Sequence, residues 1–168
     1  LERDVGSTGS APALGGWTLE FDALPEIDLD AVDLSVEVFG KTLRAPLIIG
    51  SMTGGTDRTR EINHILARAA ARTGVGMGLG SQRAMLVRPE TTSSYTVKDA
   101  APDLPLLLGN IGAVQLNYGV DLQAIRGLVD TVGADGLFLH LNPLQEAIQP
   151  EGDTRFSNLV PQLRALIP

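Results

Sequence analysis

Four apolar segments that recur at nearly even spacing constrain the fold of this chain more than any other feature. They cover residues 46–50, 75–80, 105–110 and 136–142. Successive segments begin roughly 30 residues apart, which is the length of one strand–helix unit. Because strands that alternate with helices form parallel sheets, the chain is predicted to be an α/β protein.

Helical periodicity occupies the intervals between and after these segments. Apolar residues repeat about every 3.6 positions over 62–70, 122–132 and 159–166. Thr56 or Asp57 can cap the first of these helices, and Gly74 can end it. The interval after the second segment is less regular, although Pro89 suits a helix start there. The pattern as a whole therefore predicts four βα units.

We expect these units to form the first half of a TIM (β/α)₈ barrel, a fold that needs roughly 250 residues in full. An open doubly wound sheet is the alternative. The barrel is favoured because the candidate site residues all follow strand ends. Residues 1–45 are expected to precede the barrel as a loop and a hairpin that turns at Gly40-Lys41, and residues 46–168 to supply about four βα units.

The charge balance and the residue types that are missing exclude several classes of protein. The chain has 13 Lys and Arg against 20 Asp and Glu, a formal net charge of −7. A general nucleic-acid-binding protein would show a basic face, so no nucleic-acid partner is expected. The absence of cysteine excludes disulfides, thiolate metal sites and a cysteine nucleophile. The apolar segments are far too short to span a bilayer, so we expect no membrane association and a cytoplasmic protein.

Polar residues follow the first three strand segments. Ser51-Met52-Thr53 follows the first, Ser81-Gln82-Arg83 follows the second, and Asn110 ends the third. Arg83 could bind a phosphate through two hydrogen bonds, and Asn110 could both donate to a heterocycle and accept from it. Each segment also has a purely structural explanation as a glycine turn, a solvated arginine or a local asparagine turn.

Glycine alternates with larger residues between positions 74 and 80. A period of two places Val75, Met77 and Leu79 on one face of the strand and bare glycine on the other. Because glycine is unfavourable in strands, we expect close packing of a backbone segment or a helix against the bare face.

The densest polar cluster follows the fourth segment. Alternation places His140 and Asn142 on the face opposite the leucines, and Gln145 and Glu146 follow Pro143 in the next loop. Buried polar groups need partners, so the cluster favours a ligand site over a self-satisfied polar network. Glu146 could give one oxygen to Mg²⁺, whose shell usually combines carboxylates with water and substrate phosphates. The alternative is an exposed glutamate at a helix start.

Together, the segments 45–55, 78–83 and 140–146 resemble the type 2 isopentenyl-diphosphate isomerases. The resemblance implies the N-terminal half of an FMN-binding TIM barrel. It also implies an enzyme of isoprenoid biosynthesis that interconverts isopentenyl and dimethylallyl diphosphate by a 1,3-proton shift. The cofactors implied are reduced FMN, Mg²⁺ and NADPH as the flavin reductant. The resemblance further implies a homo-oligomer, either a tetramer or an octamer.

The same resemblance assigns roles to individual residues. It implies that Gln145 and His140 are catalytic and that Glu146 binds the metal. The FMN contacts would be Ser51, Met52, Thr53, Ser81 and Asn110. The substrate contacts would be Ser81, Gln82, Arg83, His140, Asn142 and Gln145. Because glutamine is a poor acid or base, Gln145 is expected to orient the alkene or relay a proton beside a flavin that carries the hard step.

Two other functions stay open. One is an FMN-dependent TIM-barrel oxidoreductase, and the other is a non-catalytic half-barrel that assembles with a partner. The chain begins at Leu1 and ends in mid-pattern at Pro168, so we expect a truncated chain. By resemblance it lacks a basic N-terminal segment and the second half of the barrel, and is expected to be inactive alone.

Overall fold

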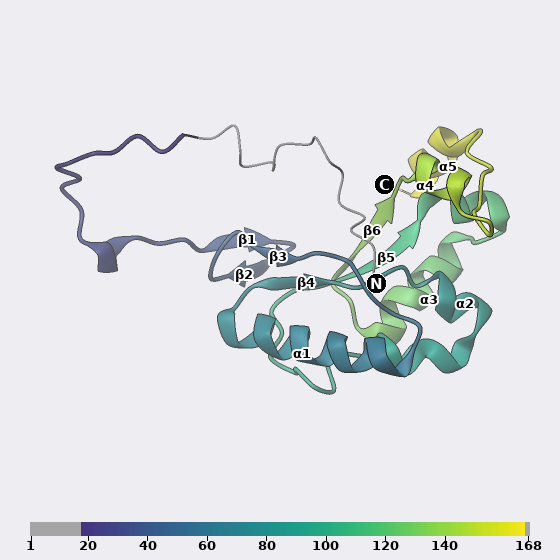
Figure 1. The fold of residues 1–168 in the computed structure, drawn as a ribbon, viewed down its shortest axis with the longest axis horizontal. Coiled ribbons are helices and arrows are strands. Elements are labelled where there is room, and N and C mark those ends of the chain that lie inside the picture. Colours follow the sequence, from purple (N-terminus) through teal and green to yellow (C-terminus); the bar gives the residue numbers. More distant parts are fainter. Residues whose placement is uncertain (1–17, 167–168) are drawn as a thin grey trace. The chain divides into compact units, whose positions relative to one another are not determined.

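The computed structural model describes residues 18–166 of the chain, so residues 1–17 of the expected loop lie outside it. The chain divides into two units, one that ends at Asp33 and one that begins at Leu34. The described part of the first unit holds one short 3-10 helix, η1 (Leu29–Ala31). All the other elements belong to the second unit (Figure 1).

Four strands form one parallel sheet in the order in which they occur along the chain. They are β3 (Ile48–Ile49), β4 (Gly76–Gly78), β5 (Leu107–Gly112) and β6 (Gly136–His140). Each strand falls within one of the predicted apolar segments or overlaps it. The α/β class and the parallel pairing are therefore confirmed.

An antiparallel hairpin precedes the sheet, in which β1 (Val36–Val38) pairs with β2 (Lys41–Leu43). Phe39 and Gly40 form its turn, and their φ angles are 52° and 69°. Two successive residues with positive φ are what a two-residue type I′ hairpin turn requires. The hairpin is confirmed, with its turn one residue earlier than the predicted Gly40-Lys41.

The two longest helices begin and end where the sequence predicts. Helix α1 (Asp57–Thr73) follows Thr56, whose hydroxyl accepts the Thr59 N–H, and it ends at Gly74 with φ of 71°. Helix α3 (Leu122–Val132) follows Asp121, whose carboxylate accepts the Ala124 N–H. Such caps satisfy main-chain groups that have no partner within the helix.

The other helices are short. The weakly periodic interval after β4 contains α2 (Arg83–Val87) and the 3-10 helix η2 (Pro89–Ser94). The remaining elements are the 3-10 helix η3 (Ala113–Tyr118), α4 (Pro143–Ile148) and α5 (Leu159–Leu166). No helix in the described part of the chain is long and apolar enough to cross a membrane.

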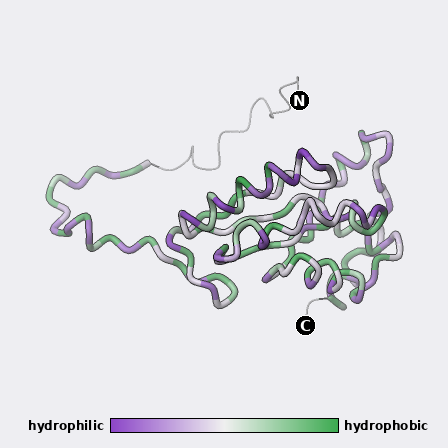
Figure 2. Tube along the Cα trace, turned by 90° about the horizontal axis from the view of Figure 1, so that it is seen from below, coloured by the Kyte–Doolittle hydropathy of each residue, from purple (hydrophilic) through white to green (hydrophobic). Residues whose placement is uncertain are grey.

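The main hydrophobic core lies between the sheet and helices α1 and α3 on one of its faces (Figure 1). Leu107 and Ile111 of β5 point into this core. Helix α1 alternates between hydrophilic and hydrophobic residues along its length (Figure 2), as an amphipathic helix must. On the other face the hairpin packs Leu43 against Leu106 and Leu108. The apolar residues in and next to β5 divide between the two faces of the sheet because successive side chains of a strand point to opposite faces.

The TIM-barrel prediction is wrong for the residues that the structure describes. They form one open four-stranded parallel sheet and a separate two-stranded antiparallel sheet, whereas a closed barrel has eight parallel strands. The barrel was inferred from polar residues at strand ends, but these ends also meet at one edge of an open parallel sheet. The consecutive strand order differs from a doubly wound sheet as well, in which the order reverses.

The alternating glycines of β4 allow a neighbouring loop to lie directly on the sheet. Val75, Met77 and Leu79 lie together in the main core, which agrees with the predicted shared face. On the bare face, a Cβ on Gly80 would overlap the Thr53 carbonyl group, whose oxygen accepts the Gly80 N–H. The predicted close approach of backbone to this strand is therefore confirmed, and it positions the loop that follows β3.

Gly80→Ala is expected to destabilise the protein by about 2 kcal/mol, because the added methyl group forces the loop after β3 away from β4. Gly127→Ala is the control. Gly127 lies exposed in the middle of α3 with nothing within 4 Å of the added Cβ, so this change should stabilise by up to about 1 kcal/mol. Urea unfolding measures both values. A Gly80→Ala protein as stable as the parent would contradict this account of β4.

Candidate functional site

The carboxyl ends of β5 and β6 bring Asn110 and His140 together. In the parallel pairing, Asn110 is the partner of Phe138 and Gly112 is the partner of His140. His140 Nδ1 donates to Asn110 Oδ1 over 2.9 Å. With the proton on Nδ1, the neutral imidazole keeps Nε2 as an acceptor. A histidine of fixed tautomer therefore stands at the predicted edge of the sheet.

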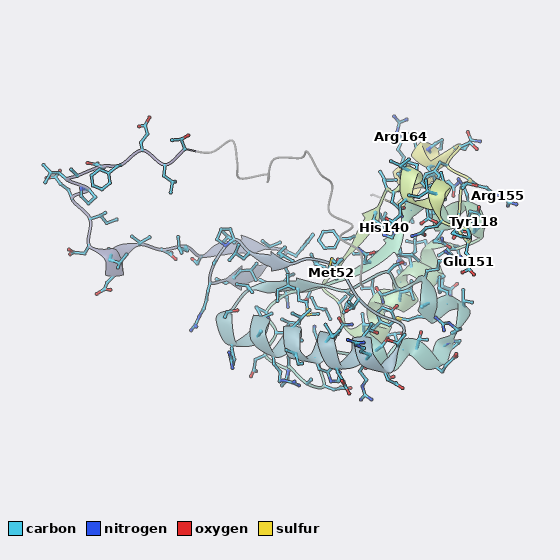
Figure 3. The ribbon with its side chains drawn as sticks, in the orientation of Figure 1. Met52, Tyr118, His140, Glu151, Arg155 and Arg164 are labelled. Atoms are coloured by element: carbon cyan, nitrogen blue, oxygen red, sulfur yellow. The ribbon has the colours of Figure 1, made fainter. Side chains whose placement is uncertain are left out.

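A cleft of about 630 Å³ opens beside this histidine. Its walls come from the residues after β4 and β5 and from α4 and the loop that follows it. It brings together six of the predicted site residues: Ser81, Arg83, His140, Asn142, Gln145 and Glu146. The rest of its lining consists of Ala84, Val87, Arg88, Gly112, Gln115, Gln149 and Glu151. His140 and Glu151 lie at the same end of the sheet (Figure 3).

Glu146 is buried although it is charged. Its Oε1 accepts from Asn142 Nδ2 at 2.9 Å, and its Oε2 accepts from the Asp153 N–H at 2.7 Å. The Oδ1 atom of Asn142 is buried without a hydrogen-bond partner. An unpaired buried acceptor beside a carboxylate is costly unless a ligand completes it. Asn142 Oδ1 and the Glu146 carboxylate are therefore better explained as ligands of a hard cation than as members of a polar network that satisfies itself.

Two guanidinium groups make one side of the cleft cationic. Arg83 Nη1 lies 2.9 Å from Asp153 Oδ2, and the Arg83 side chain keeps 41% of its surface exposed. Arg88 lies at the end of α2 and is exposed. The cleft also contains Glu146 and Glu151, so its charges are mixed and the two arginines stand beside acidic groups. Paired guanidiniums beside a serine suit an anionic phosphate.

A second cavity of about 370 Å³ shares His140 with the first. Its lining combines apolar side chains with three of the predicted polar residues: Ile48, Gly50, Ser51, Asn110, Phe138, Leu139 and His140. The Oγ atom of Ser51 is buried there without a partner. An apolar hollow with a few convergent polar atoms is typical of a small-molecule site.

Met52 and Thr53 do not line either cavity. Met52 is 80% exposed. The Thr53 hydroxyl donates to Asn63 Oδ1 at 2.6 Å, and Asn63 Nδ2 donates to the Thr53 and Ser94 carbonyls. Thr53 is thus part of the contact between the loop and α1, and the predicted FMN contacts of both residues stay predictions.

Gln82 lies inside the protein and not in the cleft. Its N–H donates to the Asn110 carbonyl at 2.7 Å, and its Oε1 accepts the Asn110 N–H at 3.0 Å. Its Nε2 donates to the Leu128 carbonyl at 3.2 Å. The amide therefore ties β4, β5 and α3 together below the site, and its predicted contact with substrate stays a prediction.

Gln115 and Asp153, both of which are buried, were not predicted from the sequence. Gln115 Nε2 donates to Asp153 Oδ2 at 2.6 Å. Gln115 follows the end of β5 just as His140 ends β6, so its position was the available signal. Asp153 stands in a polar loop, and nothing in the local pattern separates it from solvated neighbours.

The metal prediction rests on Glu146 alone. Among the residues that the structure describes, no three His, Asp or Glu side chains gather closely enough to hold a metal ion. A cation at Glu146 would therefore need oxygens from a ligand or from water, as Mg²⁺ commonly does.

No family model matches the chain. It is 51% identical over 169 residues to a Rickettsia prowazekii protein named isopentenyl-diphosphate delta-isomerase, and this match covers 99% of the chain and 48% of that protein. Proteins of the same name from Synechocystis and Synechococcus are 49% identical over 167 residues and 51% identical over 166 residues. The chain spans about half the length of the curated relatives it matches.

These findings correct the family assignment made from the sequence. The names of the relatives state an isomerisation and specify no cofactor, so they do not identify the type 2 enzymes. The described residues form an open four-stranded sheet, so the chain is not the N-terminal half of a barrel. The segments that carried the resemblance are strand-end motifs, and such motifs report local chemistry but not how a sheet closes.

Glu146→Gln is expected to lower the pKa of His140. Burial already holds this pKa below the ordinary value of 6.5, and the Glu146 carboxylate acts in the opposite direction. The folded protein favours the neutral imidazole. His140 therefore stabilises the folded state above pH 6.5, and this contribution is lost as the pH falls through the pKa of His140 in the folded protein. An NMR titration of the imidazole measures the pKa. Glu151→Gln is the control in the same cleft, and a pKa that does not fall in Glu146→Gln would refute the assignment.

Gln82→Met is expected to destabilise the protein by about 2–3 kcal/mol, since it leaves the buried Asn110 N–H and Leu128 carbonyl without their side-chain partner. The matched change Gln145→Met, at an exposed residue, should alter stability by less than about 0.5 kcal/mol. Chemical denaturation compares the two. Equal effects would show that Gln82 is not the structural link described.

Proposed function

We propose that the protein containing this chain interconverts isopentenyl and dimethylallyl diphosphate by a 1,3-proton shift, in isoprenoid biosynthesis. The observation that carries the proposal is the cleft in which two guanidiniums, a buried carboxylate and a neutral histidine converge. The chain spans about half the length of the relatives it matches, so the proposal concerns the intact protein. The name of the relatives supports the same reaction.

Arg83, Arg88 and Ser81 would bind the diphosphate. Guanidinium groups present several N–H donors in a plane that matches phosphate oxygens. The ion pair of Arg83 with Asp153 limits the positions that this side chain can occupy. The apolar lining next to these groups, from Ala84 and Val87, suits a short hydrocarbon chain.

Glu146 and Asn142 would hold Mg²⁺ against the diphosphate. The carboxylate oxygens each accept one hydrogen bond in the structure and retain further lone pairs. The unpaired Oδ1 of Asn142 is a second oxygen of the kind that Mg²⁺ prefers. The donor set therefore fits the ion, with substrate oxygens and water completing its shell.

The cavity next to β3 would hold the ring of FMN. Phe138 and Ile48 give it an apolar floor, and the unpaired Ser51 Oγ and the side chain of Asn110 give it hydrogen-bonding atoms. These features fit a planar heterocycle that is polar at its edge. Reduced FMN, regenerated by NADPH, would supply an electron-rich face and acid–base capacity beside the alkene. Ser81, Met52 and Thr53 are proposed to contact other parts of the same cofactor.

His140 and Gln145 would act on the substrate itself. A 1,3-proton shift needs one proton delivered and another removed, in a pocket from which water is excluded. Burial keeps His140 neutral, and its Nε2 can hold a proton at the border of both cavities. The Gln145 amide lies in the cleft wall and would orient the alkene. An oxidoreductase acting on an uncharged substrate would have no use for Glu146 and the two guanidiniums.

Gln145→Ala is expected to lower kcat about 100-fold, since general positioning and proton relay each contribute on that order, and to leave flavin binding intact. The assay follows dimethylallyl diphosphate formation by the full-length protein, with and without Mg²⁺ and reductant. Asp130→Asn, an exposed change on α3, is the control. Unchanged turnover would remove Gln145 from the mechanism, and an inactive full-length parent protein under all conditions would refute the proposed function.

A further inference from the structure

We infer that Asp153 is a positioning residue that holds the Arg83 guanidinium and the Glu146 carboxylate in fixed places, so that one diphosphate can meet both. The inference rests on the proposed function, because it assigns Arg83 to the diphosphate and Glu146 to the cation. Asp153 itself lines neither cavity. It would therefore act through its neighbours and not by touching the substrate.

The side chain of Asp153 is engaged with the cationic side of the cleft. Asp153 is only 8% exposed, and its Oδ2 lies 2.9 Å from Arg83 Nη1. The same oxygen accepts from Gln115 Nε2 at 2.6 Å. The ion pair uses one of the five N–H donors of the guanidinium, which leaves others for a phosphate. A long side chain that is 41% exposed would otherwise sample many rotamers.

The main chain of Asp153 is engaged with the acidic side of the cleft. Its N–H donates to Glu146 Oε2 at 2.7 Å, in a buried position. The preceding residue explains how the loop comes so close, because a Cβ on Gly152 would overlap the main-chain carbonyl of Glu146. Only glycine allows the loop to pass over α4 at this distance. One residue thus contacts both the guanidinium proposed to bind the diphosphate and the carboxylate proposed to bind the cation.

The link that Asp153 makes between Arg83 and Glu146 would matter for diphosphate binding. A diphosphate held by a guanidinium at one end and by a carboxylate-bound cation at the other needs a constant spacing between the two. The Asp153 carboxylate sets the position of Arg83, and its N–H sets the position of Glu146. The positions of Arg83 and Glu146 therefore both depend on the short loop that contains Asp153.

The test is a double-mutant cycle on the binding of inorganic diphosphate to the full-length protein, measured by calorimetry in the presence of Mg²⁺. Asp153→Asn is expected to raise the Kd about tenfold, since a charge-assisted hydrogen bond to a partly buried group is lost. In the Arg83→Ala background the same substitution should change the Kd less than twofold, because the group that it positions is gone. Asp130→Asn is the control of matched chemistry on α3.

A second arm addresses Glu146. Mg²⁺ is expected to enhance diphosphate binding, and the Mg²⁺ concentration at half of the full enhancement is the quantity measured. Gly152→Ala should raise this concentration about fivefold, because one charge-assisted hydrogen bond to Glu146 is lost. The same change should have no further effect in the Glu146→Gln background. Gly127→Ala, where the added methyl group meets nothing within 4 Å, is its control.

Three results would overturn the inference. They are an unchanged Kd in Asp153→Asn, an equal loss of affinity with and without Arg83, and an Asp153→Asn protein that is unfolded while Arg83→Ala is folded. The last two would make Asp153 a purely structural residue. These measurements use no turnover, so a protein that binds diphosphate as expected but does not isomerise the substrate would refute the proposed function and leave the inference standing.

Discussion

The buried amide of Gln82 is the contact on which the arrangement of the cleft depends. The side-chain amide bonds to the Asn110 N–H and to the Leu128 carbonyl, and the Gln82 main-chain N–H donates to the Asn110 carbonyl. The ends of β4 and β5 and the helix α3 therefore cannot move independently. Asn110, held in this way, presents its side-chain oxygen to His140 and orients the imidazole. Each of these bonds is costly to leave unmade in the interior, by about 1–3 kcal/mol, and the network is rigid for that reason.

The site lies at the edge of the sheet because of how parallel strands end. All four strands run in the same direction, so their carboxyl ends and the residues that follow them meet at one edge. Bare glycine in β4 lets the loop after β3 rest on the sheet, and Gly152 lets the loop after α4 rest on Glu146. Backbone thus approaches the site from two directions, and the cleft obtains its walls from short loops on a rigid sheet.

The sequence predicted the features that depend on local patterns, and it failed where distant segments meet. Apolar spacing and the caps at Thr56 and Gly74 predicted the strands and α1, and the polar residues at and after the strand ends predicted six residues of the cleft. The closure of the sheet was mispredicted, because strand-end chemistry is the same in open and closed parallel sheets. Gln115 and Asp153 were missed because they are 38 residues apart, and only the fold joins them.

The central claim is that a diphosphate binds between Arg83 and Glu146. A crystal structure of the intact protein grown with inorganic diphosphate and Mg²⁺ tests it most directly. We predict the two phosphates in the cleft, with one against the Arg83 guanidinium and Mg²⁺ between the other and the Glu146 carboxylate. Diphosphate bound instead in the smaller hollow formed by residues such as Gly55, Arg88 and Ser94, with the cleft at Glu146 empty, would contradict the account.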